Sequence, residues 1–288
     1  MNSVMIEAIA RRLQSGGRLT VMSGAGISAE SGIPTFRGPE GYWTVGSRVY
    51  HPQEMATRAM FDRSPREVWR WYLYRMGVCR RAAPNAGHRA LADLERLLGE
   101  RFTLITQNVD GLHLRAGSSP RRTLQIHGNV FFMRCAGECS TAVFPLPADV
   151  PAKEADEPLT DAEAALLVCP RCGGLARPHV LWFDETYNEV HYRFHSALEA
   201  AATTGVLIVV GTSGATNLPN QVAQLAKSNR ALIIDVNIQA NVFTRLALAE
   251  PAGFFIQQPA ATALPDLVRD LTAALSKTGG ADKKMTRP

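Results

Sequence analysis

The stretch RLTVMSGAG, residues 18–26, joins a short apolar run to a glycine-rich turn. An apolar run of this length predicts a buried strand, and the glycines that follow it predict a tight turn. Because Gly24 and Gly26 have no side chains, backbone N–H groups near them can approach a pyrophosphate. The stretch therefore predicts the first strand and the ligand-binding turn of an α/β sheet.

The chain continues with further alternation of strand and helix patterns. Apolar runs predict five buried strands, at residues 18–22, 102–105, 178–183, 205–210 and 231–234. Helical patterns occur at residues 4–13, 65–78, 86–98, 191–202 and 219–227, and most of these are long enough to cross between parallel strands. We therefore expect an α/β fold, with an open parallel sheet covered by helices on both faces.

Polar segments lie just past the carboxyl ends of four predicted strands. They are residues 23–26, 106–110, 211–213 and 235–237. Open α/β sheets bind ligands at this edge, which makes these segments candidates for the binding site.

Two segments interrupt the alternation and predict a smaller lobe. Residues 44–83 are helical and rich in Arg and aromatic side chains. Residues 133–177 hold four paired cysteines around a loop rich in Pro, Ala and acidic residues. Both segments are interpreted as insertions into the α/β domain.

The cysteines predict one structural zinc ion. Cys135 and Cys139 are spaced C-x₃-C, and Cys169 and Cys172 are spaced C-x₂-C. In a chain with no export signal, close pairs favour a metal over disulfides. Four thiolates fill a tetrahedral zinc site and leave no open position, which indicates a structural site. The alternative is free buried thiols, and Cys79, which stands alone in a helical pattern, is interpreted as a packing residue.

Composition limits the class of protein. The 288 residues are 46% hydrophobic, and 31 Lys and Arg stand against 26 Asp and Glu. The mild positive charge suits a small acidic ligand, and we expect no specific binding of nucleic acid. No apolar run approaches the roughly eighteen residues of a membrane span, and residues 1–12 lack a signal-peptide core. We expect a cytoplasmic protein with no membrane partner.

Since the third glycine of the turn is Gly32, the G-x-G-x-x-G spacing is absent and a plain dehydrogenase is disfavoured.

Four motifs occur in order along the chain: GAGISAESGIPTFRG at residues 24–38, TQNVDGLH at 106–113, HGN at 127–129 and GTS at 211–213. Together they resemble the sirtuin (Sir2) family of NAD-dependent protein deacylases, within a resemblance that runs from Val4 to Leu271. The resemblance implies a large Rossmann-like domain, a small zinc-containing lobe, and a cleft between them where NAD meets an acyl-lysine peptide.

The NAD-binding domain would comprise residues 1–43, 84–132 and 178–275. The small lobe would comprise a helical part, 44–83, and a zinc-binding part, 133–177, and residues 276–288 would form a flexible basic tail.

The resemblance also implies the reaction and its catalytic residues. NAD and an acyl-lysine would give nicotinamide, O-acyl-ADP-ribose and free lysine. His127 matches the catalytic position, where a neutral imidazole activates a ribose hydroxyl. Asn108 and Asp110 match positions around the nicotinamide and its ribose. The alternative for this pair is a turn cap, and the other histidines are interpreted as surface or capped core residues.

The remaining cofactor residues are implied in the same way. The loop with Phe36 and Arg37 would close over NAD, whereas Ala260 falls near the adenine. The implied NAD-binding set is Gly24, Ala25, Gly26, Ser28, Phe36, Arg37, Gln107, Asn108, Asp110, Gly211, Thr212, Ser213, Asn237 and Ala260.

Residues 68–75, VWRWYLYR, resemble the segment that supplies Tyr-x-x-Arg in the desuccinylase-like (class III) branch of sirtuins. Tyr72 and Arg75 share a helix face, so a phenol and a guanidinium could grip the carboxylate of a succinyl, malonyl or glutaryl group. The alternative is ordinary packing with a snorkelling charge. Ala56 matches a small residue that widens the acyl pocket. We expect acidic acyl groups to be favoured and acetyl to be accepted.

Two loops would pair with the substrate peptide as added strands: residues 179–185, with Val180 and Phe183, and residues 213–219. Both depart from the family pattern. Asp184 replaces a customary glycine, and residues 214–218 lack the usual apolar run before proline. The first cysteine pair also has one residue more than the more frequent C-x₂-C.

Two other classes of function remain open. A protein ADP-ribosyltransferase or an NAD glycohydrolase would break the same bond in the same cleft, but would have no use for the acyl-carboxylate grip of Tyr72 and Arg75. A nucleotide sensor without turnover would be favoured if His127, Asn108 or Asp110 were absent, and all three are present.

Overall fold

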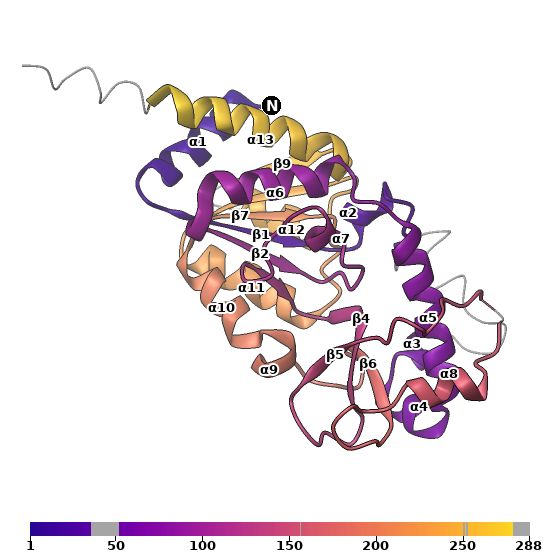
Figure 1. Ribbon diagram of the computed structural model, residues 1–288. Helices are drawn as coiled ribbons and strands as arrows, with labels where there is room; N and C mark the ends of the chain where they lie inside the picture. Colours follow the sequence, from indigo (N-terminus) through magenta and orange to yellow (C-terminus); the bar gives the residue numbers. More distant parts are fainter. Residues whose placement is uncertain (36–51, 156, 250, 252, 279–288) are drawn as a thin grey trace, which may run out of the picture.

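The computed structural model describes residues 1–35, 52–155, 157–249, 251 and 253–278. Its larger part is an α/β unit, and a smaller part lies beside it at the lower right of Figure 1.

A six-stranded sheet with the order β3-β2-β1-β7-β8-β9 forms the centre of the larger part. Every neighbouring pair in it is parallel. The strands are β1 (Arg18–Ser23), β2 (Phe102–Thr106), β3 (Thr123–Gln125), β7 (Thr204–Val210), β8 (Leu232–Asn237) and β9 (Phe254–Gln257). The strand order reverses between β1 and β7, which is the place where open α/β sheets bind ligands. The predicted open parallel sheet is confirmed.

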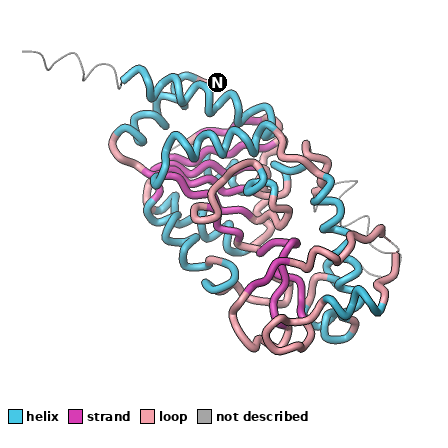
Figure 2. Tube along the Cα trace, in the orientation of Figure 1, coloured by secondary structure: helices cyan, strands magenta, loops and turns pink. Residues whose placement is uncertain are grey.

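Helices cover both faces of this sheet (Figures 1 and 2). One face packs against α1 (Ser3–Gln14), α6 (Ala86–Leu98) and α13 (Ala260–Thr278), and the other against α10 (Phe194–Thr203), α11 (Asn217–Ser228) and α12 (Val242–Leu248). In β7, Val206 and Ile208 belong to the first core, while Leu207 and Val209 belong to the second. A strand buried on both faces must be apolar throughout, which explains its uninterrupted apolar run.

The smaller part contains a second sheet and several helices. Its strands β4 (Gly128–Cys135), β5 (Val143–Pro145) and β6 (Ala176–Val180) are antiparallel, in the order β5-β4-β6. The helices α3 (Pro52–Met55), α4 (Arg58–Arg63), α5 (Pro65–Arg81) and α8 (Asp161–Leu166) lie in the same part. A hydrophobic core joins α5 to the sheet, and within it Trp69 Nε1 donates a hydrogen bond of 2.9 Å to the carbonyl oxygen of Ala176.

Two predictions about elements were wrong. The run predicted as a strand at residues 178–183 contributes to β6, which pairs with β4 in the second sheet and not with the parallel strands. The predicted lobe boundary at residue 178 therefore falls inside a strand. The single helix predicted at residues 191–202 is two helices, because Arg193 has a left-handed backbone, with φ of 55°. They are α9 (Glu189–Tyr192) and α10.

Short elements complete the described chain: α2 (Gly26–Ala29), α7 (Leu112–Arg115) and the 3₁₀ turn η1 (Gly99–Arg101). Of the helices in the described ranges, none combines the length and apolarity that crossing a membrane requires.

Candidate active site and metal centre

The turns after β1 and β7 touch each other at the edge of the sheet. Gly24 N donates to Val210 O at 2.9 Å, and Gly26 N donates to Gly211 O at 2.8 Å. A Cβ atom on Gly26 would lie 2.7 Å from Gly211 Cα, so these glycines are required for the two turns to approach. The N–H groups of Gly24 and Gly26 are paired within the protein, and the close approach of the two turns is a reason for glycine at both positions besides the predicted approach to a pyrophosphate.

Ser28 joins the two predicted catalytic residues Asn108 and Asp110. Asn108 Nδ2 donates to Ser28 Oγ at 3.0 Å and to Gly24 O at 3.1 Å. Ser28 Oγ in turn donates to Asp110 Oδ2 at 2.7 Å. The structure therefore brings residues from the first and second motifs into one buried network.

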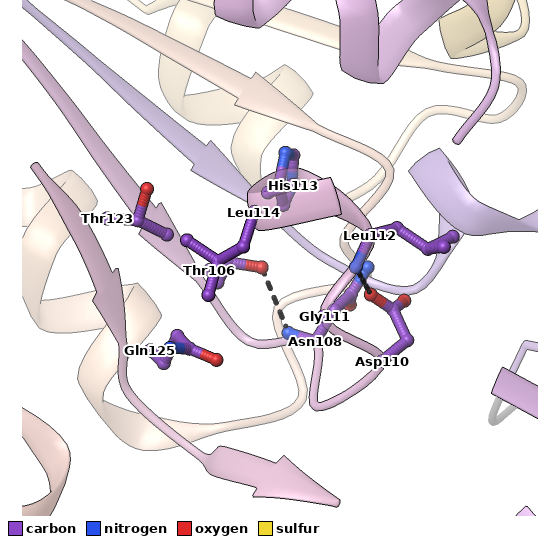
Figure 3. Close-up of a pocket in the computed structure, with 9 residues that line it drawn as sticks. All are labelled: Thr106, Asn108, Asp110, Gly111, Leu112, His113, Leu114, Thr123 and Gln125. Atoms are coloured by element: carbon purple, nitrogen blue, oxygen red, sulfur yellow. Dashed lines mark hydrogen bonds between the residues drawn. The ribbon is translucent and has the colours of Figure 1, made fainter. Parts of the chain in front are cut away.

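Asp110 and Asn108 line a small pocket beside α7 (Figure 3). Burial raises the pKa of the Asp110 carboxyl, while hydrogen bonds from Leu112 N and Ser28 and the charges of Arg115 and Arg75 oppose this shift. Leu112 N donates to Asp110 Oδ1 at 2.8 Å. Each carboxylate oxygen thus has a donor, which is how a carboxylate is retained in a buried position.

Two buried histidines adjoin this network, and their contacts were not predicted. His88 Nδ1 accepts from Asn85 N at 3.4 Å, so its Nε2 carries the hydrogen and lies 3.4 Å from Ser28 Oγ. His113 Nε2 lies 2.9 Å from Ser23 Oγ. Burial lowers the pKa of His88 to about 4 and that of His113 well below its usual range, so both are neutral. The signal in the sequence was the three-residue spacing of Asn85 and His88, which forms a capping box at the start of α6.

His127 connects the two sheets, since it stands between β3 and β4. Its Nδ1 lies 2.9 Å from Gln107 O, and its Nε2 lies 2.8 Å from the hydroxyl of Tyr187. Because a carbonyl oxygen can only accept, Nδ1 carries the hydrogen and Nε2 presents its lone pair. Burial lowers the pKa of His127 to about 4, which keeps the imidazole neutral at physiological pH.

Gly128 fixes the backbone next to this histidine. Its φ is 82°, and a Cβ atom there would lie 2.1 Å from the carbonyl oxygen of His179 in β6. Leu181 N also donates to His127 O at 3.0 Å. The glycine of the His-Gly-Asn motif is therefore required by the close crossing of β4 and β6.

Thr212 and its neighbours form the other side of the predicted cofactor edge. Gln107 Nε2 donates to Thr212 Oγ1 at 2.9 Å, and Asn237 Nδ2 donates to Thr212 O at 3.0 Å. Ser213 is exposed beside them. The structure thus brings the predicted residues from β2, β7 and β8 together.

Of the remaining predicted cofactor residues, the structure describes Ala25 and Ala260 but not Phe36 and Arg37. Ala25 is the N-cap residue of α2. Ala260 is buried as the first residue of α13, where Glu30 Oε2 accepts a hydrogen bond of 2.7 Å from Ala261 N. Phe36 and Arg37 lie outside the described residues.

The predicted acyl-binding residues surround the buried phenol of Tyr72. Its hydroxyl oxygen accepts a hydrogen bond of 3.0 Å from Trp182 Nε1, and burial raises its pKa to about 12. The guanidinium carbon of Arg75 lies 5.5 Å from the centre of the Tyr72 ring and 4.7 Å from that of Trp71. Tyr72 and Arg75 are only 1% and 4% exposed, which also agrees with a packing role. Ala56 is buried near them, and its carbonyl oxygen accepts from Phe183 N at 2.9 Å.

The predicted peptide loops differ in exposure. Val180 is buried at the end of β6, whereas the Phe183 side chain is 56% exposed. In the other loop, Asn220 Nδ2 donates to Gly214 O at 2.8 Å and to Thr216 O at 2.9 Å. The Asn220 side chain of α11 therefore holds this loop through two of its backbone carbonyl oxygens.

Asp184 caps α4 from the neighbouring loop. Its Oδ1 accepts from Arg58 N at 2.7 Å, and its Oδ2 accepts from Ala59 N at 3.1 Å. Thr57 Oγ1 accepts the next N–H, that of Met60, at 3.1 Å. Because the first N–H groups of a helix have no partner within it, the carboxylate stabilises this helix start. The departure from glycine at residue 184 thus has a structural explanation.

The four paired cysteines converge in the second sheet and its loops. Their sulfur atoms all lie within 4.8 Å of one another. The distance is 3.7 Å between Cys135 and Cys172 and 3.6 Å between Cys139 and Cys169, too long for a disulfide. Thiolates bound to tetrahedral zinc at about 2.3 Å lie about 3.8 Å apart, so the spacing fits this metal.

Backbone amides favour the thiolate form that zinc requires at two of the four cysteines, Cys135 and Cys169. Hydrogen bonds from the backbone of Arg171 and Cys172 lower the pKa of Cys169 to about 7. The backbone of Cys139 lowers the pKa of Cys135 in the same way. The predicted tetrad is confirmed as a group suited to zinc, and the additional residue between Cys135 and Cys139 does not prevent their convergence.

The fold and site define a doubly wound α/β protein with a polar ligand edge at its switch point and a tetracysteine metal site in a second sheet. The chain belongs to the Sir2 family, whose model, SIR2, matches residues 24–217.

Two relatives and one solved structure illustrate this membership. The NAD-dependent protein deacylase of Leptospira interrogans is 37% identical over 268 residues, covering 93% of this chain and 98% of that protein. The NAD-dependent protein deacylase 2 of Pyrobaculum aerophilum is 40% identical over 267 residues, covering 93% of this chain and 96% of that protein. A Sir2 homologue mutant in complex with 2′-O-acetyl ADP ribose aligns with a TM-score of 0.78 and 34% identity, covering 96% of this chain and 98% of that chain.

Proposed function

We propose that this protein removes acyl groups from lysine side chains of proteins in an NAD-dependent reaction. The observation that carries the proposal is His127, a half-buried neutral imidazole whose Nε2 lone pair lies at the sheet edge next to the polar network of Asn108 and Asp110. The relatives named as NAD-dependent protein deacylases, and the neighbour that holds an acetylated ADP ribose, support it.

NAD would bind at the carboxyl ends of β1, β2, β7 and β8. The turns at residues 24–26 and 211–213 would lie against its phosphates, and Asn237 would lie on its adenosine side. Asn108 and Asp110 would orient the nicotinamide and its ribose by hydrogen bonds. Their own hydrogen bonds with Ser28 fix the positions of both side chains before NAD binds.

The chemistry begins with the acyl carbonyl oxygen of the substrate, which bonds to C1′ of the nicotinamide ribose as the bond to nicotinamide breaks. Nε2 of His127 then accepts the proton of a ribose hydroxyl, which becomes nucleophilic. The lysine amine would then leave the acyl carbon, and one water molecule would add to that carbon, so that NAD, acyl-lysine and water would give nicotinamide, O-acyl-ADP-ribose and free lysine. Gln107 contributes through its carbonyl oxygen, which keeps the hydrogen on Nδ1 and the lone pair on Nε2.

Acidic acyl groups would be favoured over acetyl. The phenol of Tyr72 accepts from Trp182, so its own proton can be donated to a carboxylate, and its raised pKa keeps that proton in place at neutral pH. Arg75, one helical turn further, would supply the opposite charge.

A second function, ADP-ribosyl transfer to protein or hydrolysis of NAD, uses the same cofactor edge. The buried pair of Tyr72 and Arg75 favours deacylation, because neither of these reactions needs a group that binds an acyl carboxylate.

The test is a panel of matched peptides that carry acetyl-, succinyl-, malonyl- or glutaryl-lysine, incubated with NAD and followed by mass spectrometry. We expect faster removal of the acidic groups. Arg75→Met should lower the succinyl-to-acetyl ratio of kcat/KM at least about tenfold, the value of one charge-assisted contact. Arg80→Met, on the exposed side of the same helix, is the control and should leave the ratio unchanged. An unchanged ratio in Arg75→Met would remove the proposed acyl preference but not the deacylase chemistry.

A further inference from the structure

The hydroxyl of Tyr187 lies 2.8 Å from Nε2 of His127. The centres of the two rings are 5.8 Å apart, with an angle of 33° between their planes. Tyr187 belongs to the loop between β6 and α9, sixty positions from His127 in sequence. A side chain that the sequence analysis did not single out thus contacts the atom that the proposed reaction uses as a base.

The donor in this contact can be assigned. Nδ1 of His127 faces the carbonyl oxygen of Gln107 at 2.9 Å and must carry the hydrogen of the neutral ring. Nε2 therefore accepts, and the Tyr187 hydroxyl donates. Burial raises the pKa of Tyr187 to about 12, so the phenol keeps its proton at any pH at which the enzyme works.

The surroundings of Tyr187 hold it in this position. Its ring stacks on Phe194 of α10, with centres 6.4 Å apart. The Thr216 hydroxyl adjoins the phenol and donates its hydrogen to Gln107 Oε1 at 3.1 Å. Tyr187 is therefore held between Phe194 of α10 and Thr216, whose hydroxyl is bonded to the Gln107 side chain next to β2.

We propose that Tyr187 is a positioning residue that caps the base: its hydroxyl holds the Nε2 lone pair of His127 until a ribose hydroxyl of bound NAD replaces it. This inference rests on the proposed function, in which Nε2 accepts the ribose proton. An imidazole nitrogen has one lone pair, so it cannot accept from both hydroxyls at once. The Tyr187 hydrogen bond must break before the ribose hydroxyl can donate.

The cap acts on only one of the two chemical steps. Release of nicotinamide, when the acyl oxygen bonds to C1′, needs no proton acceptor at Nε2. Formation of O-acyl-ADP-ribose does need it. The Tyr187 hydroxyl therefore competes with the substrate in the second step and leaves the first unchanged.

The kinetic experiment compares Tyr187→Phe with wild type and with Tyr192→Phe. The Phe replacement at 187 keeps the ring that stacks on Phe194, and Tyr192 is a buried phenol in the neighbouring helix that stacks on His179 and not on His127. Exchange of labelled nicotinamide into NAD reports the first step, and single-turnover formation of O-acyl-ADP-ribose reports the second.

We expect the second step to be about two- to tenfold faster in Tyr187→Phe, the value of one ordinary hydrogen bond, with nicotinamide exchange unchanged. Tyr192→Phe should match wild type in both. The cap would be overturned if the rate of the second step in Tyr187→Phe were equal to or lower than that of wild type. It would also be overturned if the variant changed the rates of both steps equally.

A second readout does not depend on activity. The ¹⁵N resonance of Nε2, assigned by its loss in His127→Ala, distinguishes a hydrogen-bonded acceptor nitrogen from an unbonded one. We expect the bonded signature in NAD-free wild type and Tyr192→Phe and the unbonded one in Tyr187→Phe, and addition of NAD to Tyr187→Phe should restore the bonded signature. An unbonded Nε2 in NAD-free wild type would refute the cap. If the cap is seen but no acyl-lysine is deacylated, the proposed function fails and the contact stands.

Discussion

The Ser28 hydroxyl donates a hydrogen bond of 2.7 Å to Oδ2 of Asp110, although eighty-two positions separate the two residues. The same hydroxyl accepts from Asn108 Nδ2 at 3.0 Å. A group that donates to one proposed NAD-binding residue and accepts from another fixes both at once. The turn after β1 therefore organises the turn after β2.

Ser28→Ala should weaken the use of NAD. The buried Asp110 carboxylate would lose one donor and Asn108 would lose one acceptor, and hydrogen bonds to charged groups contribute about 1.5–3 kcal/mol. We expect kcat/KM for NAD to fall at least about tenfold, measured with a saturating acyl peptide. Ser15→Ala, at the exposed end of α1, is the control. Equal kcat/KM values for NAD in Ser28→Ala and Ser15→Ala would show that the Ser28 network does not organise the site.

Asp184→Gly should destabilise the smaller part of the protein. The variant leaves Arg58 N and Ala59 N without their acceptor, and loss of a helix cap costs about 1 kcal/mol. The melting temperature should fall by roughly 2–4 °C in a scanning calorimeter. Asp184→Asn keeps an acceptor oxygen and should recover part of the loss. A melting temperature at or above that of wild type would mean that the cap contributes nothing.

The cysteine tetrad should bind one zinc ion per chain. Cys172→Ser removes one of four thiolates that lie within 4.8 Å of one another, and should lower the zinc content measured by elemental mass spectrometry. Removal of zinc with a chelator should lower the melting temperature, because binding to the folded state alone stabilises it. Cys79→Ala, which removes the thiol outside the tetrad, should keep its zinc. Equal zinc contents in the two variants would contradict this site.

Acidification from pH 7 should destabilise the fold through histidines whose pKa is lower in the folded protein than in the unfolded chain. Burial lowers the pKa of His88 and His127 to about 4 and that of His179 to about 3. In the unfolded chain each titrates near pH ~6.5, so below this pH the unfolded state binds more protons than the folded state. The free energy of unfolding therefore falls between about pH 6.5 and pH 4.

Urea unfolding at several pH values measures this dependence. His88→Gln removes one of these proton-binding sites and should make the decline shallower within the same window. A free energy of unfolding that rises on acidification, or an equal slope in the variant, would contradict the assignment of His88 as buried and neutral.

The parallel sheet and much of the polar edge could be predicted because they depend on local patterns. Apolar runs locate β1, β2, β7 and β8 within a few residues, and motifs in a fixed order indicate which turns meet at the edge. The strand β9 was not predicted, since its residues are only partly buried at the edge of the sheet and lack a continuous core pattern. The sheet to which β6 belongs could not be predicted either, because apolarity reports burial but not the partner strand.

The contacts missed in the site are those between positions far apart in sequence. Tyr187 contacts His127 across 60 positions, and Asp184 contacts Arg58 across 126 positions. A single sequence carries no spacing that could show either contact. Candidate residues for the chemistry could be proposed from their motifs, whereas the groups that contact them could not.

The most direct test of the central claim is the product balance of one reaction. Purified protein, NAD and a succinyl-lysine peptide are incubated together, and free lysine peptide, nicotinamide and O-succinyl-ADP-ribose are quantified, with His127→Ala as control. The account predicts equal amounts of the three products in wild type and no O-succinyl-ADP-ribose in His127→Ala. Nicotinamide released with free ADP-ribose or an ADP-ribosylated protein, and no deacylated lysine with this peptide or with its acetyl-, malonyl- and glutaryl-lysine counterparts, would contradict it.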